Sequence, residues 1–402
     1  MTLRDRAEAV LRANDRGRYT VPSPKLYPHQ WAWDSAFAAI GWAHLDPDRA
    51  VTELETLLAG QWPDGRIPHI LFHDLTGRYF PGPEFWQTQN SSTITQPPVW
   101  ASAARRLWEL GACRRRLTSL LPAIERSHQF FWQQRDPLGW HLVAVTHPWE
   151  SGMDNSPTWD EPLQAVDPTQ APAFQRVDKE IVGDSNQRPS DDEYRRYAVL
   201  VQQIAQNGFG LSQFQVYDPC MSAILAKAEQ DLHWLTQQAG FDSHSGRRAL
   251  ACREALWERL WNESSGRFAF YDVPSQSYLT SEVLACYVPL ILDLERPSNL
   301  STNLAQNFAA PYGWPTVPLG APHYERVRYW RGPSWINLNW MLAGEQVVQS
   351  SLSMIEREGF FEYFDPESGR GLGGNNFTWT AALTLDWLAR ERRSEEHTSE
   401  LQ

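Results

Sequence analysis

The sequence predicts an all-α protein whose helical hairpins are arranged in a ring, an α/α toroid. About a dozen segments carry apolar residues at helical spacing, whereas strand signals are confined to residues 140–145 and 267–271. A connector with an acidic turn that closes on a glycine recurs between helices, at residues 135–140, 262–268 and 364–369. In such a ring the inner helices direct one set of loops toward a central cavity, so we expect short β hairpins and a functional site at one mouth.

Start and stop signals place the helices. The first is expected at residues 3–14. Asp46 followed by Pro47 predicts the start of the next long helix, because aspartate caps free N–H groups and proline fits the first turn, and Gly60 predicts its end. Asp218 and Pro219 repeat this start for a helix that runs toward Gly240. The other expected helices are residues 35–44, 99–110, 115–133, 192–206, 247–261, 280–292, 334–343, 346–357 and 378–390.

Two segments do not fit this pattern. Residues 174–192 are polar and irregular, and we expect them to form an insertion or lid beside the site. Residues 391–402 are polar with little periodicity, and we expect this tail to be disordered or foreign to the natural protein. A chain of 402 residues could hold two domains or one large barrel; we expect a single barrel domain over residues 1–390.

Composition narrows the function. The chain has 20 tryptophans and a formal net charge of −12, which favours flat apolar ligand surfaces such as sugar-binding faces and argues against nucleic acid. The four scattered cysteines form no C-x-x-C pair. No apolar run approaches a membrane span, and no signal peptide is visible, so we expect a cytoplasmic protein. The sequence leaves a homo-oligomer open.

The stretch 147–160 contains the strongest candidate for chemistry. Glu150, Asp154 and Asp160 lie there among two tryptophans, two prolines and a glycine, so the segment is expected to be a loop. A carboxyl group held against an indole has its charged form desolvated, which raises its pKa and makes it a proton donor near neutral pH. Asp154 is therefore a candidate general acid of a glycoside hydrolase. The alternative is that Asp154 only caps the turn that follows it.

Hydrolysis of a glycosidic bond needs a second carboxyl group. Glu362 is the best candidate, because it lies between aromatic residues directly after an expected helix. Four glycines between residues 369 and 376 allow tight turns close to a ligand, but they do not match a phosphate-binding signature.

Other residues have the chemistry of a sugar site. Tyr27, Trp31 and Asp34 are spaced for one face of a helical turn, where rings stack on a sugar and a carboxylate accepts from its hydroxyls; the alternative is a capping aspartate beside packed aromatics. Gln96 precedes a helix that begins at proline, and its amide could reach the cavity.

A further group is suited to the other end of a substrate. Arg188 could bind an anionic group, assisted by Tyr194, although the acids at 191–193 are explained by a helix N-terminus. Tyr329, Trp330 and Trp335 flank a Gly-Pro turn and could face a ligand or simply pack in the core.

No metal site or cofactor is expected. His69 and His73 are four residues apart, but the glutamate of the zinc-protease motif is absent. Asp191 and Asp192 lack the second acidic element that a metal-dependent cyclase of apolar substrates needs.

Together these motifs resemble the family 63-type glycoside hydrolases, most closely the bacterial mannosylglycerate and glucosylglycerate hydrolases. The resemblance runs from about Tyr27 to Trp387, and its specific blocks are residues 27–34, 149–157, 329–333 and 362–366. It implies an (α/α)6 barrel, an inverting mechanism on an α-glycoside, the acid at Asp154 and the base at Glu362. It places Tyr27, Trp31, Asp34, Gln96, Trp149 and Gly152 around the sugar. It places Arg188, Tyr194, Tyr329, Trp330 and Trp335 near the aglycone and its carboxylate.

One feature departs from that pattern. Only about ten residues separate Trp340 from the helix ahead of Glu362, where a fuller hairpin is expected. A shortened barrel wall would lower stability or alter the position of Glu362. An α-glucosidase or trehalase-like hydrolase of oligosaccharides and a non-catalytic sugar-binding barrel are the alternative functions.

Overall fold

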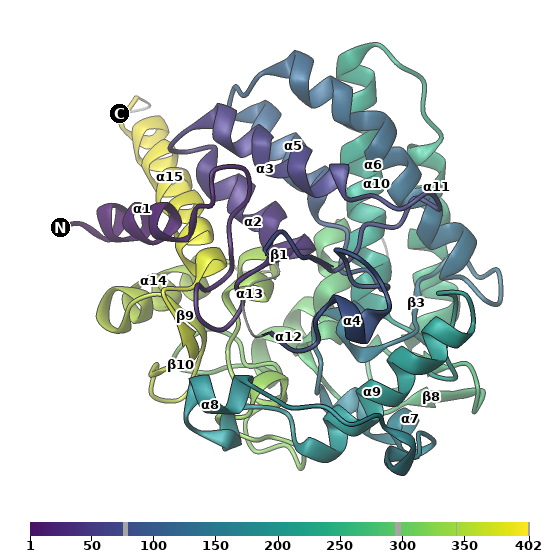
Figure 1. Cartoon of the computed structure of the whole chain (residues 1–402). Helices are drawn as coiled ribbons and strands as arrows, with labels where there is room; N and C mark the ends of the chain where they lie inside the picture. Colours follow the sequence, from purple (N-terminus) through teal and green to yellow (C-terminus); the bar gives the residue numbers. More distant parts are fainter. Residues whose placement is uncertain (75–78, 294–298, 343, 401–402) are drawn as a thin grey trace.

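The computed structural model, drawn in Figure 1, describes residues 1–74, 79–293, 299–342 and 344–400. Its helices form an inner and an outer ring. Within these residues, each inner helix contacts the next, and the last one closes the ring against the first. The inner helices are, in order, α2 (Ala32–Trp42), α5 (Trp100–Glu109), α10 (Pro219–Ala239), the 3₁₀ helix Leu284–Leu292, α13 (Ile336–Leu342) and α15 (Thr378–Glu400).

The outer helices pack on the inner ring and alternate with it along the chain. They are α1 (Leu3–Asn14), α3 (Pro47–Ala59), α6 (Arg114–Gln134), α11 (Ser245–Ala255), α12 (Leu300–Asn307) and α14 (Glu345–Glu358). The alternation of inner and outer helices in six hairpins confirms the predicted (α/α)6 barrel.

The start signals act as the sequence predicts. Asp46 accepts hydrogen bonds from the backbone N–H groups of Asp48 and Arg49, at 3.1 and 3.0 Å. Asp218 caps α10 in the same way, and Gly240 ends that helix with a φ of +76°, in the left-handed region that favours glycine.

Several elements differ from the sequence prediction. The helix expected at 280–292 is a 3₁₀ helix that starts at Leu284, because Pro289 inside it removes a backbone donor. The helix expected at 247–261 ends at Ala255 and continues as one π turn. Helix α12 was not predicted, because an eight-residue helix with two buried apolar residues shows little periodicity. Ala343, at the end of another predicted helix, lies outside the described residues.

The C-terminal segment also differs. Helix α15 continues to Glu400, so the tail expected to be disordered is helical up to that residue. Arginine and glutamate are good helix formers, and no glycine or proline stops the helix. Leu401 and Gln402 lie outside the described residues.

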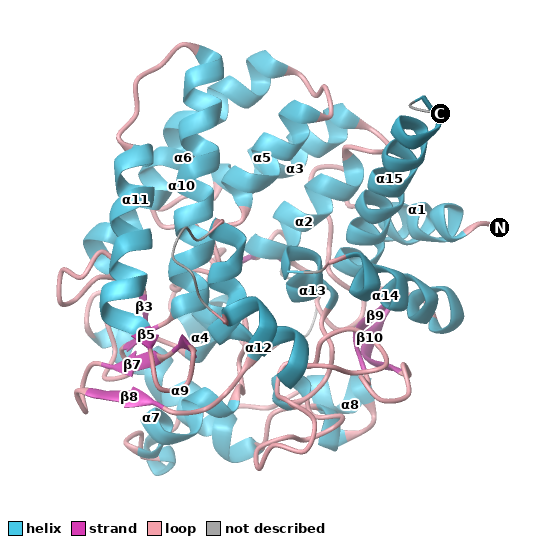
Figure 2. Ribbon diagram, turned by 180° about the vertical axis from the view of Figure 1, so that it is seen from behind, coloured by secondary structure: helices cyan, strands magenta, loops and turns pink. Residues whose placement is uncertain are grey.

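Short strands and helices gather at one end of the ring, where the chain enters the inner helices (Figures 1 and 2). Antiparallel pairs join β1 (Gln30–Trp31) to β2 (Ile70–Leu71), β5 (Trp261–Asn262) to β6 (Arg267–Phe268), and β9 (Phe361–Phe364) to β10 (Gly371–Asn375). A four-stranded sheet has the order β3 (Ala144–Val145), β4 (Val216–Tyr217), β7 (Phe270–Asp272), β8 (Ser277–Leu279). The short helices are α4 (Pro83–Trp86), α7 (Asp160–Gln164) and α8 (Asp178–Val182), followed by the longer α9 (Asp191–Gln206).

The opposite end of the ring is held by one buried carboxylate. Asp386 on α15 accepts hydrogen bonds from Arg106 on α5 (2.9 and 2.8 Å) and from the indole of Trp340 on α13 (3.0 Å). It also contacts His44 (2.9 Å) and pairs with Arg390 (2.7 Å). Three inner helices are thus joined around one side chain.

Within the described residues, no helix combines the length and the hydrophobicity needed to cross a membrane.

Replacement of Asp386 by asparagine should lower the free energy of unfolding by about 3 kcal/mol, because it leaves the largely buried Arg106 without its buried partner. Burial alone would raise the pKa of Asp386, but His44, Arg390 and Arg106 lower it below the usual value. The carboxylate therefore stabilises the fold fully above the unfolded-state pKa of about 4, and this contribution is lost as the pH falls through the folded pKa. Urea unfolding should show a constant difference between wild type and Asp386→Asn above about pH 5 that shrinks in acid. A difference that grows in acid would contradict this assignment.

Candidate active site

A pocket lies at the N-terminal ends of the inner helices, where the loops that lead into α2, α5, α13 and α15 meet the segment 149–154. Its empty volume is about 590 Å³, including the open solvent at its mouth. All but one of the residues predicted for the site line this pocket: Tyr27, Trp31, Asp34, Gln96, Trp149, Gly152, Asp154, Arg188, Tyr194, Tyr329, Trp330 and Glu362.

The acid loop, residues 147–160, contains three acids that differ in their ion-pair partners. Glu150 forms a buried ion pair with Arg135 at 2.8 Å, and its carboxylate also accepts the backbone N–H of Thr146 at 2.9 Å. Asp160 pairs with Arg331 at 2.7 Å. Among the described residues, Asp154 has no ion-pair partner, and its side chain faces the pocket.

The environment of Asp154 favours its protonated form. Burial raises the pKa of Asp154 to about 8, and the charge of Glu362 adds to this, while Arg188 opposes it. The alternative role, a cap on the following turn, is filled by Ser156, whose side chain accepts the backbone N–H of Thr158. The backbone carbonyl of Asp154 accepts the hydroxyl of Tyr197 at 2.7 Å.

Glu362 enters the same pocket from strand β9 and is 1% exposed. Its carboxylate accepts hydrogen bonds from the hydroxyl of Tyr27 at 2.8 Å and from the backbone N–H of Gly374 at 3.0 Å. Burial raises the pKa of Glu362, and Arg188, Gly374 and Tyr27 oppose this by stabilising the carboxylate. Gly373 has a φ of +69°, and a Cβ there would lie 2.5 Å from the Glu362 carboxylate, so the hairpin needs glycine at this position.

Helix α13, in the barrel wall ahead of Glu362, is short: it has 7 residues, whereas the inner helix α2 has 11. Glu362 nevertheless lines the pocket. Its strand is fixed by Ser334, which exchanges backbone hydrogen bonds with Phe364 at 2.8 and 2.9 Å, and by the indole of Trp379, which donates to the Glu362 carbonyl at 3.2 Å. The β9–β10 hairpin, rather than a long helix, holds this carboxylate.

Arg188 belongs to the segment 174–192, which contains α8, and its side chain lines the pocket. It is 3% exposed and donates to Asp178 at 3.1 Å and, weakly, to Glu362 at 3.5 Å. Its guanidinium also lies 4.2 Å from the ring centre of Tyr329. A cation with this geometry can bind an anionic ligand group.

The side of the pocket near α2 is built from rings and amides. Asp34 is 3% exposed, and its Oδ1 has no hydrogen-bond partner in the described part of the chain. Gln96 accepts the backbone N–H of Trp33 at 3.2 Å. Gly152 has a φ of +72°, and a Cβ there would lie 2.5 Å from the indole of Trp33, so only glycine lets the acid loop approach α2 this closely.

Trp335 is the exception among the predicted residues. It is buried behind the pocket wall, stacked on Trp330 with ring centres 3.6 Å apart, and its indole donates to the Tyr329 carbonyl at 3.0 Å. The Gly-Pro turn does not direct it outward, because the ring is sandwiched between Trp330 and Tyr363. Trp335 supports the pocket rather than lining it.

Sequence reasoning missed other lining residues, including Trp33, His69, Tyr79, Phe377 and Trp379. His69 was considered only as a metal ligand. It contacts Ser92 through Nδ1 at 2.6 Å, and burial and the neighbouring His147 hold its pKa well below the usual value. Trp33 and Trp379 could have been flagged by their position at the starts of inner helices. Within the described residues, no group of three or more His, Cys, Asp or Glu side chains could hold a metal ion.

An (α/α)6 barrel with two carboxyl groups in an aromatic pocket has the fold and site of a glycoside hydrolase. The family model of the mannosylglycerate hydrolase MGH1-like glycoside hydrolase domain matches residues 27–380. The chain belongs to this family, which confirms the resemblance read from its motifs.

Relatives cover nearly the whole chain. A mannosylglycerate hydrolase from Thermus thermophilus is 38% identical over 95% of this chain and 99% of its own length. A glucosylglycerate hydrolase from Mycolicibacterium hassiacum is 34% identical over 95% of this chain and 97% of its own length. The crystal structure of a GH63 mannosylglycerate hydrolase from Thermus thermophilus in complex with Tris and D-glycerate has a TM-score of 0.90 at 37% identity and covers 96% of this chain and 100% of its own.

The likeness to neutral trehalase from Saccharomyces cerevisiae shows the fold alone. That structure has a TM-score of 0.59 at 14% identity over 92% of this chain and 73% of its own.

The pH dependence of activity should follow the two carboxyl groups. If Asp154 must be protonated, kcat/KM falls as the pH rises through its pKa of about 8. If Glu362 must be ionised, kcat/KM also falls in acid, at a pH above the ordinary pKa of a glutamate. A pH–rate profile of the wild type measures both limbs, and an alkaline limb that Asp154→Asn leaves in place would contradict the assignment to Asp154.

Proposed function

We propose that this chain is an inverting α-glycoside hydrolase that converts glucosylglycerate or mannosylglycerate to the hexose and glycerate. The observation that carries the proposal is the contrast within the acid loop, where Glu150 and Asp160 are neutralised by arginines and Asp154 is left with a pKa of about 8 in the pocket that holds Glu362. The choice of substrates is supported by a mannosylglycerate hydrolase at 38% identity and a glucosylglycerate hydrolase at 34% identity.

In the proposed reaction, Asp154 donates its proton to the glycosidic oxygen as the bond to the anomeric carbon breaks. Glu362 takes a proton from a water that attacks the anomeric carbon from the opposite face, and the configuration inverts. Inversion requires roughly 6.5–9.5 Å between the carboxyl groups, whereas roughly 5–5.5 Å would fit retention. Tyr27 and Gly374 support the role of Glu362, because both donate to its carboxylate and favour the ionised form.

The hexose would bind on the side of α2. The unpartnered Oδ1 of Asp34 is an acceptor for sugar hydroxyls, and Trp31 and Trp149 offer rings for stacking. Gln96 and Gly152 shape the same side. Whether this side selects glucose or mannose depends on contacts to one or two hydroxyl groups, and relatives of both kinds exist.

The glycerate would bind on the side of Arg188, with its carboxylate on the guanidinium and with Tyr194, Tyr329 and Trp330 around it. The D-glycerate in the complex of the Thermus thermophilus relative supports an acidic aglycone. A cytoplasmic location, the absence of a nucleic-acid partner and an open oligomeric state stay predictions from the sequence.

The proposal is tested by incubation of wild type and Asp154→Asn with α-glucosylglycerate, α-mannosylglycerate, trehalose and kojibiose, with the released anomer followed by NMR. We expect β-sugar from a glycerate compound in the wild type and a loss of about 10²- to 10⁴-fold in Asp154→Asn, the usual contribution of a general acid. Turnover of the disaccharides alone would move the substrate to oligosaccharides. Sugar binding without any turnover would favour a non-catalytic barrel.

The acidic aglycone is tested separately at Arg188. Arg188→Ala should raise KM for the glycerate compound by about 10- to 100-fold, the loss of one or two hydrogen bonds to a charged group. KM for the corresponding glycoside of glycerol, which has no carboxylate, should rise far less. Arg176→Ala is the matched control, because Arg176 pairs with the same Asp178 at 2.6 Å but does not line the pocket. An unchanged preference for glycerate over glycerol in Arg188→Ala would overturn this role.

A further inference from the structure

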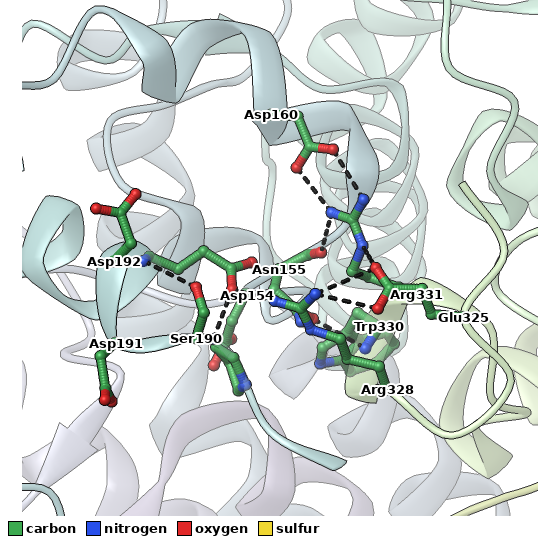
Figure 3. A network of polar contacts seen from close by, with 12 residues as sticks. Asp154, Asn155, Asp160, Ser190, Asp191, Asp192, Glu325, Arg328, Trp330 and Arg331 are labelled. Carbon is green, nitrogen blue, oxygen red and sulfur yellow. Dashed lines mark hydrogen bonds and ion pairs between the residues drawn. The ribbon is translucent and has the colours of Figure 1, made fainter. Parts of the chain in front are cut away.

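A cluster of ion pairs outside the pocket joins the acid loop to the turn 325–331 and to the start of α9 (Figure 3). The cluster is defined by five charged side chains, Asp160, Glu193, Glu325, Arg328 and Arg331, and none of them lines the pocket. The three segments that it joins are far apart in the sequence, so its contacts to Asp160 and Glu193 fix tertiary geometry.

Arg331 binds the part of the acid loop that follows Asp154. Its guanidinium donates to both oxygens of Asp160, at 2.7 and 2.8 Å, and more weakly to the backbone carbonyl of Asn155 at 3.4 Å. The side-chain amide of Asn155 accepts the backbone N–H of Trp330 at 3.0 Å. The segment 155–160 is therefore held at both ends by two consecutive residues of the turn (Figure 3).

The turn itself is held in place from the other side. Arg331 Nε donates to Glu325 at 2.7 Å, and the Arg331 carbonyl accepts the backbone N–H of Glu325 at 2.8 Å. Arg328 bridges Glu325, at 3.1 Å, and Glu193 on α9, at 2.5 Å. Tyr329, between these arginines, has a φ of +42°, an unfavourable conformation for a residue with a side chain, so these contacts stabilise a strained turn.

Asp154 needs such support from outside, because its own side chain has no ion-pair partner in the described part of the chain. We propose that Arg331 is a positioning residue for the general acid, which holds the segment 155–160 directly after Asp154 so that Asp154 faces the glycosidic oxygen. This inference rests on the proposed function, since it assumes that Asp154 is the acid. It predicts an effect on the proton-donation step in particular.

Two substrates separate proton donation from the rest of catalysis. The glycerate of a glycosylglycerate leaves as an alkoxide unless Asp154 protonates the glycosidic oxygen, whereas an α-glycosyl fluoride releases fluoride ion, which needs little help from an acid. Arg331→Lys keeps the charge but loses the planar fork, and Asp160→Asn weakens the same pair from its half-exposed partner. We expect each to lower kcat for the glycerate compound by about 10- to 100-fold, the effect of a misplaced catalytic group, with kcat for the fluoride changed less than about threefold.

Asp154→Asn shows the largest effect expected: activity on the glycerate compound is lost and activity on the fluoride is retained. Arg116→Lys is the matched control. Arg116 forms a similar fork with Glu55, at 2.9 and 2.7 Å, between the outer helices α6 and α3, so both substrates should be unaffected. Thermal unfolding checks that Arg331→Lys and Asp160→Asn fold.

Equal losses on both substrates, or no loss on either, would overturn the positioning role of Arg331 while the proposed function stands. A wild type that hydrolyses neither the glycerate compounds nor the fluorides would overturn the proposed function and this inference with it.

Discussion

Arg135 and Glu150 form an ion pair that is almost completely shielded from water, and the pocket is assembled around it. The side chains of both residues are 1% exposed, and the Glu150 carboxylate also accepts the backbone N–H groups of Thr95 and Thr146. One carboxylate therefore ties the end of α6, the loop that carries Gln96 and the acid loop. A buried charge with its hydrogen bonds satisfied keeps a single geometry, because any shift leaves a charge unpaired in a medium of low polarity.

This ion pair and a second one explain how one loop with three acids presents a single proton donor. Two of the carboxylates are used to fix the loop, one against Arg135 and one against Arg331, and their charges are cancelled there. Asp154 lies between these two fixed points and forms no ion pair within the described residues, so burial is the largest influence on its pKa. The loop combines rigidity at its ends with an altered acid in its middle.

Local chemistry explains which features the sequence could predict. Asp46, Pro47 and Gly60 act on their immediate neighbours, so the helix that they bound could be predicted, and the density of aromatic and acidic residues marked the loops of the pocket. Trp335 could not be placed, because its burial depends on Trp330 and Tyr363, which meet it only in the folded chain. The pairing of Asp160 with Arg331, 171 residues away, was hidden for the same reason.

Because the inner helices α2 and α15 begin at the pocket, the positive ends of their dipoles converge there. This field favours a negative charge on Glu362 and on a bound carboxylate. The protein as a whole has a formal net charge of −12, so an anionic substrate is repelled at a distance and attracted only near the pocket. Salt screens the long-range repulsion more than the shielded local attraction, and the association rate of such a substrate should therefore rise with ionic strength.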